Sequence, residues 1–403
     1  MATRSNPIQD QVAIVGVGSA PYSRDSRRSL LDLGLEAAVN AIRDANVDRS
    51  QIDGICGTGL GLGIMVTHGP GVLSLQGALG IPSLSWSMNG WLGSHLVYAA
   101  NAVYSGTCDY CLIVQAEHRI SAWSKAASQD PFRLRAGRFG VHSTVPSVHY
   151  SEGWIHGAES YAAFANRYMH DYGAPRETFG MFAVNNRQWA SQNPAAVKRT
   201  PFTMEEYLEA RMIRKPLGVL DMDLPVDGAE ALVITTAERA KDLRPDPVFL
   251  HAMSLGQAPV AEFYENGNWG QQAPWKAFQH LWARSELQVN DMDLFYPYDG
   301  YTPISLALTE AAGFAPQGEG WRLVQDSWNA EEQKLALNGR TRVHTGGGSL
   351  SHGRTGGTNY YTEAVHQLRG EAGEGRQVKD AKTALFGIGS FFHDPTAMLF
   401  RVD

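Results

Sequence analysis

The chain has 403 residues, more than one ordinary hydrophobic core holds, so we expect two domains or one that is internally duplicated. With 43% hydrophobic and 19% charged residues it has the composition of a soluble globular protein, and a net charge of -7 without a basic block argues against a nucleic-acid partner. The N-terminal MATRSNPIQD lacks the apolar core of a signal peptide and no later window approaches a membrane span, so we expect a cytoplasmic protein.

The first part of the chain predicts strands that alternate with helices. A buried-type strand is expected at residues 12–17, and a helix at 29–45, where apolar residues recur at helical spacing. A short strand at 52–56, a helix at 94–104 and a strand at 111–117 follow. This alternation is typical of a parallel sheet with helices on its faces.

A glycine pair after the first strand resembles the start of a dinucleotide-binding fingerprint. It reads Gly16-Val17-Gly18, but the third glycine is absent, Pro21 stands instead, and no helix opens at once. The match is too weak to predict a nucleotide site.

The sequence contains three cysteines. Cys108 and Cys111 form a CxxC, which suggests a redox or zinc site, but a strand is expected to begin there and to bury Cys111 in the sheet. No second CxxC completes a metal site, so we favour a structural role. Cys56 lies in a Gly-rich loop and is the one thiol expected to have an opening to solvent, although a structural role leads there too.

Residues 85–106, SWSMNGWLGSHLVYAANAVYSG, combine a short strand, an Asn-Gly tip and a nearly all-apolar helix. Some enzymes place their nucleophile at such a buried strand-to-helix junction. Here the tip reads Asn89-Gly90-Trp91-Leu92-Gly93, with no Cys, Ser or Lys at its apex. The junction is therefore expected to carry no nucleophile.

The alternation breaks at residues 118–215, which are rich in Trp, His, Arg and Tyr and predict an inserted lobe that shapes a substrate site. The pattern then restarts, with strands expected at 231–240 and 247–255, helices at 274–287 and 303–312, a Gly-rich stretch at 344–357, a helix at 359–370, and strands near 383–390 and 397–402. The stretch near residue 290 echoes the one near residue 50, which indicates an internal duplication.

At this point the chain resembles a known family, the thiolase superfamily, in its branch of sterol carrier protein-x and lipid-transfer proteins. The resemblance runs from about residue 11 to 400 and rests on DANVDRSQIDGI, SGTCDYCLIVQAEH, LEARMIRKPLGVLDMDLPVDGAEALVIT and TEAVHQLRGEAGEGRQV. It implies an α/β thiolase fold with duplicated αβαβα halves, a dimer, and acyl-CoA thioester substrates. The implied division is an N-terminal half (1–117 and 216–243), an inserted loop lobe (118–215) and a C-terminal half (244–403).

The family's catalytic positions are altered in this sequence. Gly90 stands where thiolases carry the attacking Cys, and Tyr298-Asp299-Gly300-Tyr301 replaces the branch's usual His-Asp-Cys-Phe. Asn-Thr-Ser-Gly-Gly becomes His344-Thr345-Gly346-Gly347-Gly348, and the Gly-His-Pro of the second catalytic His becomes Gly353-Arg354-Thr355, preceded by His352. The final loop, Phe386-Gly387-Ile388-Gly389, has no Cys. These departures imply that no covalent Cys intermediate forms.

The Tyr-Asp-Gly-aromatic motif resembles a subset of this branch that also lacks the Cys, the aldolases of bacterial steroid side-chain degradation. Those enzymes cleave a β-hydroxyacyl-CoA by retro-aldol chemistry into a ketone and a shortened acyl-CoA. The reaction needs a base for the β-hydroxyl, donors for the thioester enolate oxygen and an acid for the α-carbon. Tyr298 is the candidate acid/base. Because a free phenol has a pKa of about 10, we expect a cationic neighbour, Arg354 or His352. The alternative is that Tyr298 is a core residue whose hydroxyl forms a hydrogen bond and takes no part in catalysis.

The remaining candidates support this chemistry less specifically. His344 is expected to donate to the enolate oxygen or relay a proton, or else to cap a Gly-rich turn. His352 and Arg354 lie at a helix start, which favours an anionic group, and Arg354 could hold the thioester oxygen or a CoA phosphate. The substrate site is expected to include Gly90 as its floor, Trp91 as a wall, Tyr301, Gly389 and His393, the last of which alternatively helps to build a turn.

Other residues are expected to brace the site or shape its wall. Asp299 is predicted to accept hydrogen bonds that brace the turn of Tyr298, and Glu117 and Glu310 to brace the fold or a dimer. An apolar wall suited to a bulky ring substrate is suggested by Trp86, Trp91, Trp123, Trp154 and Tyr301.

No metal site is expected, because no cluster of His, Cys or carboxylate has ligand spacing, and no cofactor, because CoA is part of the substrate. The resemblance implies a homodimer and a small OB-fold and zinc-ribbon protein that binds acyl-CoA; we expect that partner to be a separate chain. Two alternatives stay open: a non-catalytic thiolase-like subunit that binds acyl-CoA or lipid in a larger complex, and a thiolase that uses Cys56 from a displaced loop.

Overall fold

The computed structural model describes residues 5–57, 71–89, 93–118, 157–256, 273–389 and 395–403. The first half of the fold contains β1 (Val12–Ser23), β2 (Gly54–Gly57), β3 (Trp86–Asn89), β4 (Tyr110–His118), β7 (Asp227–Thr236), α1 (Leu30–Asp44), α2 (Val72–Leu79), α3 (Ser94–Tyr104) and α10 (Ala237–Leu243). The segment between β4 and β7 contains α7 (Gly157–Tyr172), α8 (Glu177–Ser191), α9 (Met204–Glu209), β5 (Met212–Arg214), β6 (Leu217–Gly218) and η2 (Val219–Asp221).

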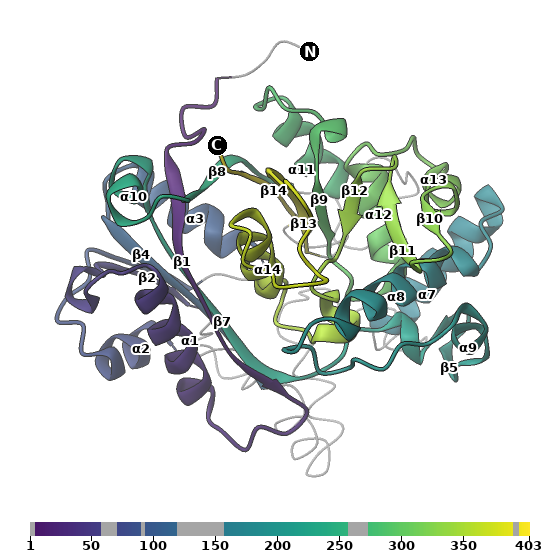
Figure 1. The fold of residues 1–403 in the computed structure, drawn as a ribbon, viewed down its shortest axis with the longest axis horizontal. Coiled ribbons are helices and arrows are strands. Elements are labelled where there is room, and N and C mark those ends of the chain that lie inside the picture. The colour runs from purple at the N-terminus through teal and green to yellow at the C-terminus, as the bar shows by residue number, and fades with distance from the viewer. Residues whose placement is uncertain (1–4, 58–70, 90–92, 119–156, 257–272, 390–394) are drawn as a thin grey trace, which may run out of the picture.

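The second half begins with the strand after α10. It contains β8 (Val248–Leu255), β9 (Leu294–Pro297), β10 (Trp328–Asn329), β11 (Lys334–Leu337), β12 (Thr341–Val343), β13 (Thr383–Ile388), β14 (Thr396–Arg401), α11 (Ala273–Trp282), α12 (Thr302–Ala311), α13 (Gly320–Asp326) and α14 (Thr358–Leu368). Figure 1 shows the first half on the left and most of the second half on the right, with α14 between them.

The two halves have mirrored strand orders within one sheet. Read outward from the centre, β1-β7-β4-β2-β3 of the first half corresponds to β8-β14-β13-β9-β12 of the second. In each half the two inner pairs are antiparallel and the two outer pairs are parallel. The strands β1 and β8 pair antiparallel through Ala13 with Phe249 and Ile14 with Val248, which joins the halves. The predicted internal duplication is confirmed.

The sequence echo near residues 50 and 290 has a structural counterpart. A short 3-10 helix precedes the equivalent strands β2 and β9: η1 (Arg49–Gln51) and η4 (Val289–Asp291). In each, the backbone N–H of the residue before the turn donates to a side chain three residues later, Asp48 to Gln51 and Gln288 to Asp291. Reciprocal capping of this kind fixes the start of a helical turn, so both turns aim the following strand in the same way.

Small residues on β1 set the distance to its covering helix. A side-chain carbon at Gly16 would lie 2.2 Å from the carbonyl oxygen of Ala41, and one at Gly18 would lie 2.3 Å from its backbone nitrogen. The glycines that resembled a nucleotide fingerprint therefore allow α1 to pack closely on the strand. In the middle of the molecule, α14 contacts β1 and β7 of the first half and β13 of the second.

Several predicted boundaries shift for identifiable reasons. The first strand was expected at 12–17 but β1 runs to Ser23, and its pairing with β7 slips between Ala20 and Ser23, where Pro21 has no N–H to donate. The strand expected at 231–240 ends at Thr236, whose hydroxyl caps α10 by accepting from the N–H of Arg239. The helix expected at 274–287 is α11, which ends earlier, at Trp282. The helix expected at 94–104 is confirmed.

All three cysteines are buried, and none of them forms a disulfide within the described residues. Cys108 and Cys111 are 1% and 0% exposed, and burial raises the pKa of the Cys111 thiol, as expected for a structural pair. Cys56 is 0% exposed within β2, so the expected opening to solvent is wrong: the residue precedes the Gly-rich loop and lies inside the sheet. Within the described residues, no helix is long and apolar enough to cross a membrane and no group of His, Cys, Asp and Glu is arranged to hold a metal ion.

Candidate active site

A buried tyrosine–arginine pair lies at the carboxyl end of β9. The Nε of Arg354 donates a hydrogen bond to Tyr298 Oη at 2.7 Å and lies 2.9 Å from Asp223 Oδ2. The backbone N–H of Tyr298 donates to the carbonyl oxygen of Gly387 on β13 at 2.7 Å, which fixes the turn after β9. A side-chain carbon at Gly300 would lie 2.6 Å from the Tyr298 ring, so this position requires glycine to leave room for the phenol.

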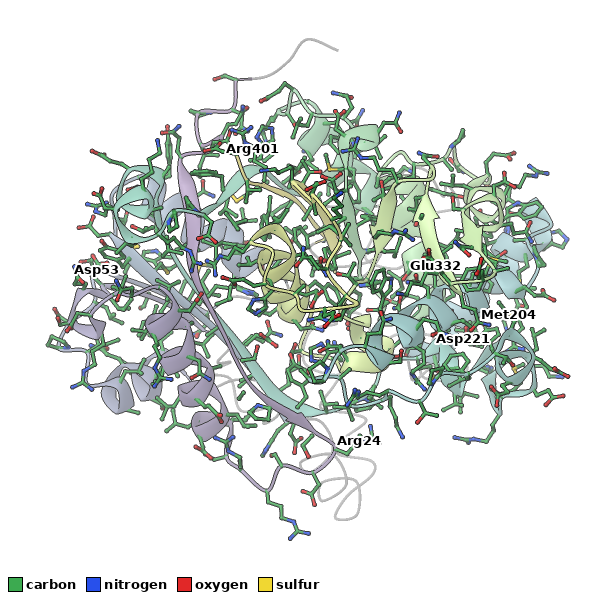
Figure 2. The ribbon with its side chains drawn as sticks, in the orientation of Figure 1. Arg24, Asp53, Met204, Asp221, Glu332 and Arg401 are labelled. Atoms are coloured by element: carbon green, nitrogen blue, oxygen red, sulfur yellow. The ribbon has the colours of Figure 1, made fainter. Side chains whose placement is uncertain are left out.

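Backbone pairing with the first half of the chain holds the loop that carries Arg354. The N–H of Arg354 donates to the carbonyl oxygen of Leu224 at 3.0 Å, and the N–H of Leu224 donates to Ser349 at 2.9 Å. Pro225 forms an isolated bridge with Arg354, and its carbonyl oxygen accepts from Arg24, which Figure 2 labels beyond the end of β1. Arg354 Nη1 is buried and has no hydrogen-bond partner among the described residues, so this nitrogen is available to a ligand oxygen.

Asp299 is the hub of the turn next to Tyr298. Its Oδ1 accepts from the N–H of Ser349 at 2.8 Å and from the Tyr360 hydroxyl, and its Oδ2 accepts from Asn186 Nδ2 at 2.7 Å and from the N–H of Leu350 at 3.1 Å. The carboxyl is 0% exposed. Its predicted role as an acceptor that braces this turn is confirmed. It also ties α8 and α14 to the turn that follows β9.

His344 is buried at the start of the Gly-rich stretch, in a left-handed conformation with φ 51°. Its Nε2 lies 2.5 Å from the carbonyl oxygen of Pro297, and its own carbonyl oxygen accepts from the N–H of Gly347 at 2.8 Å. Burial lowers the pKa of His344, so the ring is neutral and Nε2 carries its proton toward Pro297. The remaining Nδ1 is then an acceptor, which favours the alternative of a turn-bracing residue over donation to an enolate oxygen.

His352 packs against a different partner, Tyr22. Its ring lies against Tyr22 at 4.5 Å between centroids, and burial lowers its pKa to about 4, so it is neutral at pH 7. Of the two cations expected beside Tyr298, the structure places Arg354 there. His352 instead lines a cavity of about 460 Å³, together with Ser19, Asn193, Glu230, Asn359, Thr362 and Glu363.

A second polar cluster, which the sequence did not reveal, supports the same loop from the other side. Glu230 on β7 accepts from Ser19 at 2.6 Å, from Tyr22 at 2.7 Å and from Thr362 at 2.7 Å. The Tyr22 hydroxyl also lies 2.7 Å from Thr355 Oγ1, next to Arg354 in the chain. Burial raises the pKa of Glu230 to about 7 although three hydroxyls donate to it. Long-range strand pairing creates this cluster, so local spacing carried no signal for it.

Replacing Glu230 with glutamine should stabilise the protein more at pH 8 than at pH 5. The folded-state pKa of about 7 lies above the ordinary value of 4.5, so the unfolded chain loses this proton first as the pH rises. The free energy of unfolding of the wild type therefore falls by roughly 3 kcal/mol between pH 5 and pH 8. Glutamine does not ionise, so the variant avoids this fall. The difference in Tm between variant and wild type should become more positive with pH, while the exposed Glu331→Gln should show no such trend. A pH-independent difference for Glu230→Gln would contradict the assignment.

The other predicted substrate-site residues are only partly described. Tyr301 precedes α12 and stacks on Tyr161 at 4.5 Å between centroids, which agrees with an aromatic wall. Gly389 follows β13 with φ 112°, a conformation that favours glycine. Trp86 is half-buried on β3. Outside the described residues lie Gly90, Trp91, Trp123, Trp154 and His393.

The two glutamates expected to brace the fold are both buried. Glu310 accepts from the N–H groups of Gly318 at 3.0 Å and Gly320 at 2.9 Å and from the Tyr168 hydroxyl, so it holds the turn before α13. Glu117 accepts from Gln115 Nε2 at 3.3 Å on β4. The contacts of Glu310 tie it to the turn before α13, and the contact of Glu117 lies within β4.

Comparison with known proteins assigns the family. The chain is 31% identical over 370 residues to the 17-hydroxy-3-oxo-4-pregnene-20-carboxyl-CoA lyase of Mycobacterium tuberculosis, covering 90% of this chain and 92% of the relative. Residues 262–401 match the thiolase C-terminal domain-like family. The chain belongs to the thiolase superfamily.

Two further relatives refine its place in the thiolase superfamily. A steroid side-chain-cleaving aldolase of Thermomonospora curvata is 31% identical, covering 89% of this chain and 90% of the relative. The solved structure of a Ltp2-ChsH2(DUF35) aldolase matches with a TM-score of 0.82 and 28% identity, covering 98% of this chain and 99% of that chain. The predicted family, fold class and enzyme class, a carbon–carbon lyase of thiolase fold, are confirmed by these relatives.

Proposed function

We propose that this chain cleaves a β-hydroxyacyl-CoA by a retro-aldol reaction, giving a ketone or aldehyde and a shortened acyl-CoA. The observation that carries the proposal is the buried Tyr298–Arg354 pair, in which the guanidinium donates to the phenol oxygen at 2.7 Å. Gly90 at the nucleophile position of the sequence fits a reaction without an acyl-enzyme. The relatives named as a lyase and as an aldolase support the same reaction class.

The proposed mechanism moves one proton through Tyr298. Arg354 stabilises the phenolate of Tyr298, which accepts the proton of the substrate's β-hydroxyl. The bond between Cα and Cβ then breaks, its electron pair forms the thioester enolate, and the β-carbon leaves as the carbonyl carbon of the ketone. Tyr298 returns the proton to the α-carbon, so the enzyme ends in its starting state. The hub at Asp299 keeps the turn that carries Tyr298 in place throughout.

We further propose a bulky ring-bearing substrate, with a steroid side chain or an aromatic group. The names of the relatives support this: one is a lyase of a pregnene carboxyl-CoA and another is a steroid side-chain-cleaving aldolase. The Ltp2-ChsH2(DUF35) aldolase supports a separate DUF35 partner for this chain, and we propose that this partner binds acyl-CoA. A homodimer, the absence of any further cofactor and a cytoplasmic location belong to the same proposal.

The test is an assay on a panel of β-hydroxyacyl-CoAs with tertiary hydroxyls, with ketone release and free thiol measured separately. We expect ketone without free CoA, and more turnover when a purified DUF35 protein is added. Free CoA would instead indicate thiolase or hydrolase chemistry. Binding of acyl-CoA without turnover, with and without the DUF35 protein, would favour the alternative of a non-catalytic subunit. Full activity without any companion would remove the partner from the proposal.

A further inference from the structure

The hydroxyl of Tyr361 is buried and has no hydrogen-bond partner among the described residues. The residue is 0% exposed on α14, and its ring packs on Phe386 at 5.0 Å and on Phe400 at 5.5 Å between centroids. Leaving a buried hydroxyl unpaired is unfavourable, and such groups in native proteins call for an explanation, of which an absent ligand is one. A phenylalanine at this position would fill the same space without burying an unpaired hydroxyl. The presence of the hydroxyl therefore indicates a function for it.

The unpaired hydroxyl points to the first turn of α3. A side-chain carbon at Gly93 would lie 2.7 Å from Tyr361 Oη, so the two residues approach closely and glycine is required there. Gly93 is the N-terminal cap of α3 and has no side chain with which to cap it, and α3 is eleven residues long. A helix N-terminus carries a partial positive charge that stabilises a negatively charged oxygen. The hydroxyl and the helix end therefore favour the same kind of ligand atom.

The position of Tyr361 also connects to the proposed acid/base. Its neighbour Tyr360 on α14 donates to Asp299, which follows Tyr298 in the chain. Tyr361 packs against β13, whose Gly387 accepts the backbone N–H of Tyr298. The same helix and strand thus support both phenols. In the chain, Gly93 lies three residues after Gly90, the nucleophile position of the superfamily.

Among the groups already assigned, Arg354 Nη1 is the one donor left for the enolate oxygen, and an oxyanion generally takes more than one. Arg354 Nε is shared between Tyr298 and Asp223. His344 directs its N–H to Pro297, and His352 lines the cavity on the Tyr22 side. Tyr361 is fully buried, and burial raises the pKa of its hydroxyl, so it keeps its proton at neutral pH. Within the part of the chain that the structure describes, no group accepts its hydrogen.

We propose that the Tyr361 hydroxyl, at the N-terminus of α3, donates a hydrogen bond to the thioester oxygen of the bound acyl-CoA. This inference rests on the proposed function. When the bond between Cα and Cβ breaks, its electron pair moves into the enolate and negative charge gathers on that oxygen. The hydrogen bond from Tyr361 strengthens as the charge grows, and no proton is transferred by it. Tyr361 is in this sense a catalytic residue, because it touches the reacting thioester.

The test replaces Tyr361 with phenylalanine, which removes only the oxygen. We expect kcat to fall by about a hundredfold or more, the usual effect of losing one oxyanion donor. We also expect Tm to stay level or rise, because a buried hydroxyl without a partner is lost. Tyr168→Phe is the matched control: its buried hydroxyl bonds to Glu310, so that variant should lose Tm and keep kcat. An unchanged kcat in Tyr361→Phe would overturn the inference.

A second readout separates this inference from the proposed function. Isotope-edited infrared spectroscopy of bound butanoyl-CoA, labelled at the thioester carbonyl, reports the hydrogen bond without turnover. The carbonyl stretch should lie at lower frequency on wild type than on Tyr361→Phe. Such a shift without ketone release in the panel assay would refute the proposed aldolase reaction but support the hydrogen bond from Tyr361. Equal carbonyl frequencies on the two proteins would overturn the hydrogen bond from Tyr361. Failure of butanoyl-CoA to bind at millimolar concentration would overturn it too.

Discussion

Replacing Tyr298 with phenylalanine should lower kcat for ketone release by about a thousandfold, with KM changed only severalfold. A positioned acid/base contributes on the order of 10²–10⁴-fold, and here one phenol serves both proton transfers. Phenylalanine keeps the ring that packs over Gly300 and loses only the oxygen that accepts from Arg354. Stopped assays of ketone release across a range of substrate concentrations separate kcat from KM, and Tyr168→Phe again controls for the loss of a buried hydroxyl.

The two members of this pair should act as a unit. Arg354→Met removes the charge that stabilises the phenolate, so its activity should fall at neutral pH and recover in part at higher pH. Tyr298→Phe has no phenolate to recover and should stay inactive across that range. The double variant should be no slower than Tyr298→Phe, because effects of residues that act together are not additive. Multiplied defects in the double variant, or a Tyr298→Phe enzyme with a tenth of wild-type activity, would refute the assignment.

Replacing Asp299 with alanine should destabilise the protein by about 3 kcal/mol or more. The change leaves the N–H groups of Ser349 and Leu350 and the amide of Asn186 buried without their acceptor, and each such loss costs about 1–3 kcal/mol. The Tyr360 hydroxyl retains Ser349 Oγ as a partner at 2.5 Å, which limits the damage. Thermal and urea unfolding measure the effect.

The matched control for this substitution is Asp326→Ala. Asp326 is exposed at the last turn of α13, where an acidic side chain opposes the helix dipole. Its removal should therefore leave the Tm level or raise it slightly. Asp299→Asn should fall between the alanine variant and wild type, since one of its two oxygens remains as an acceptor. A Tm for Asp299→Ala within a degree of wild type would show that the hub does not hold the turn.

The parts of the fold that could be predicted are those determined by local pattern. The nearly all-apolar run of α3 predicted its bounds, and the repeated turn before β2 and β9 revealed the duplication. Where the bounds were wrong, the deciding atoms lay elsewhere in the chain: β1 continues past Pro21 because β7 pairs with it beyond a register shift. A single sequence contains no signal for that pairing.

The candidate site divides in the same way. The motif around Tyr298 identified the candidate acid/base, and the sequence offered two candidates for its cationic neighbour. Only the fold shows that Arg354, and not His352, bonds to the phenol. Glu230 and Tyr361 went unnoticed because each occurs within an element that looks like ordinary core. Their importance comes from groups that meet them from distant segments, such as Ser19 and Gly93.

The seam between β1 and β8 has a consequence for the ancestry of the chain. Equivalent strands of the two halves meet there antiparallel, as identical strands do across the twofold axis of a symmetric dimer. The chain thus has the form of two ancestral subunits fused end to end, and fusion freed the copies from having to stay alike. The second copy has Tyr298, Asp299 and Arg354 in its loops. The first supplies supporting contacts from Tyr22, Asp223 and Glu230. Selection can therefore alter the chemistry in one copy while the other conserves the frame.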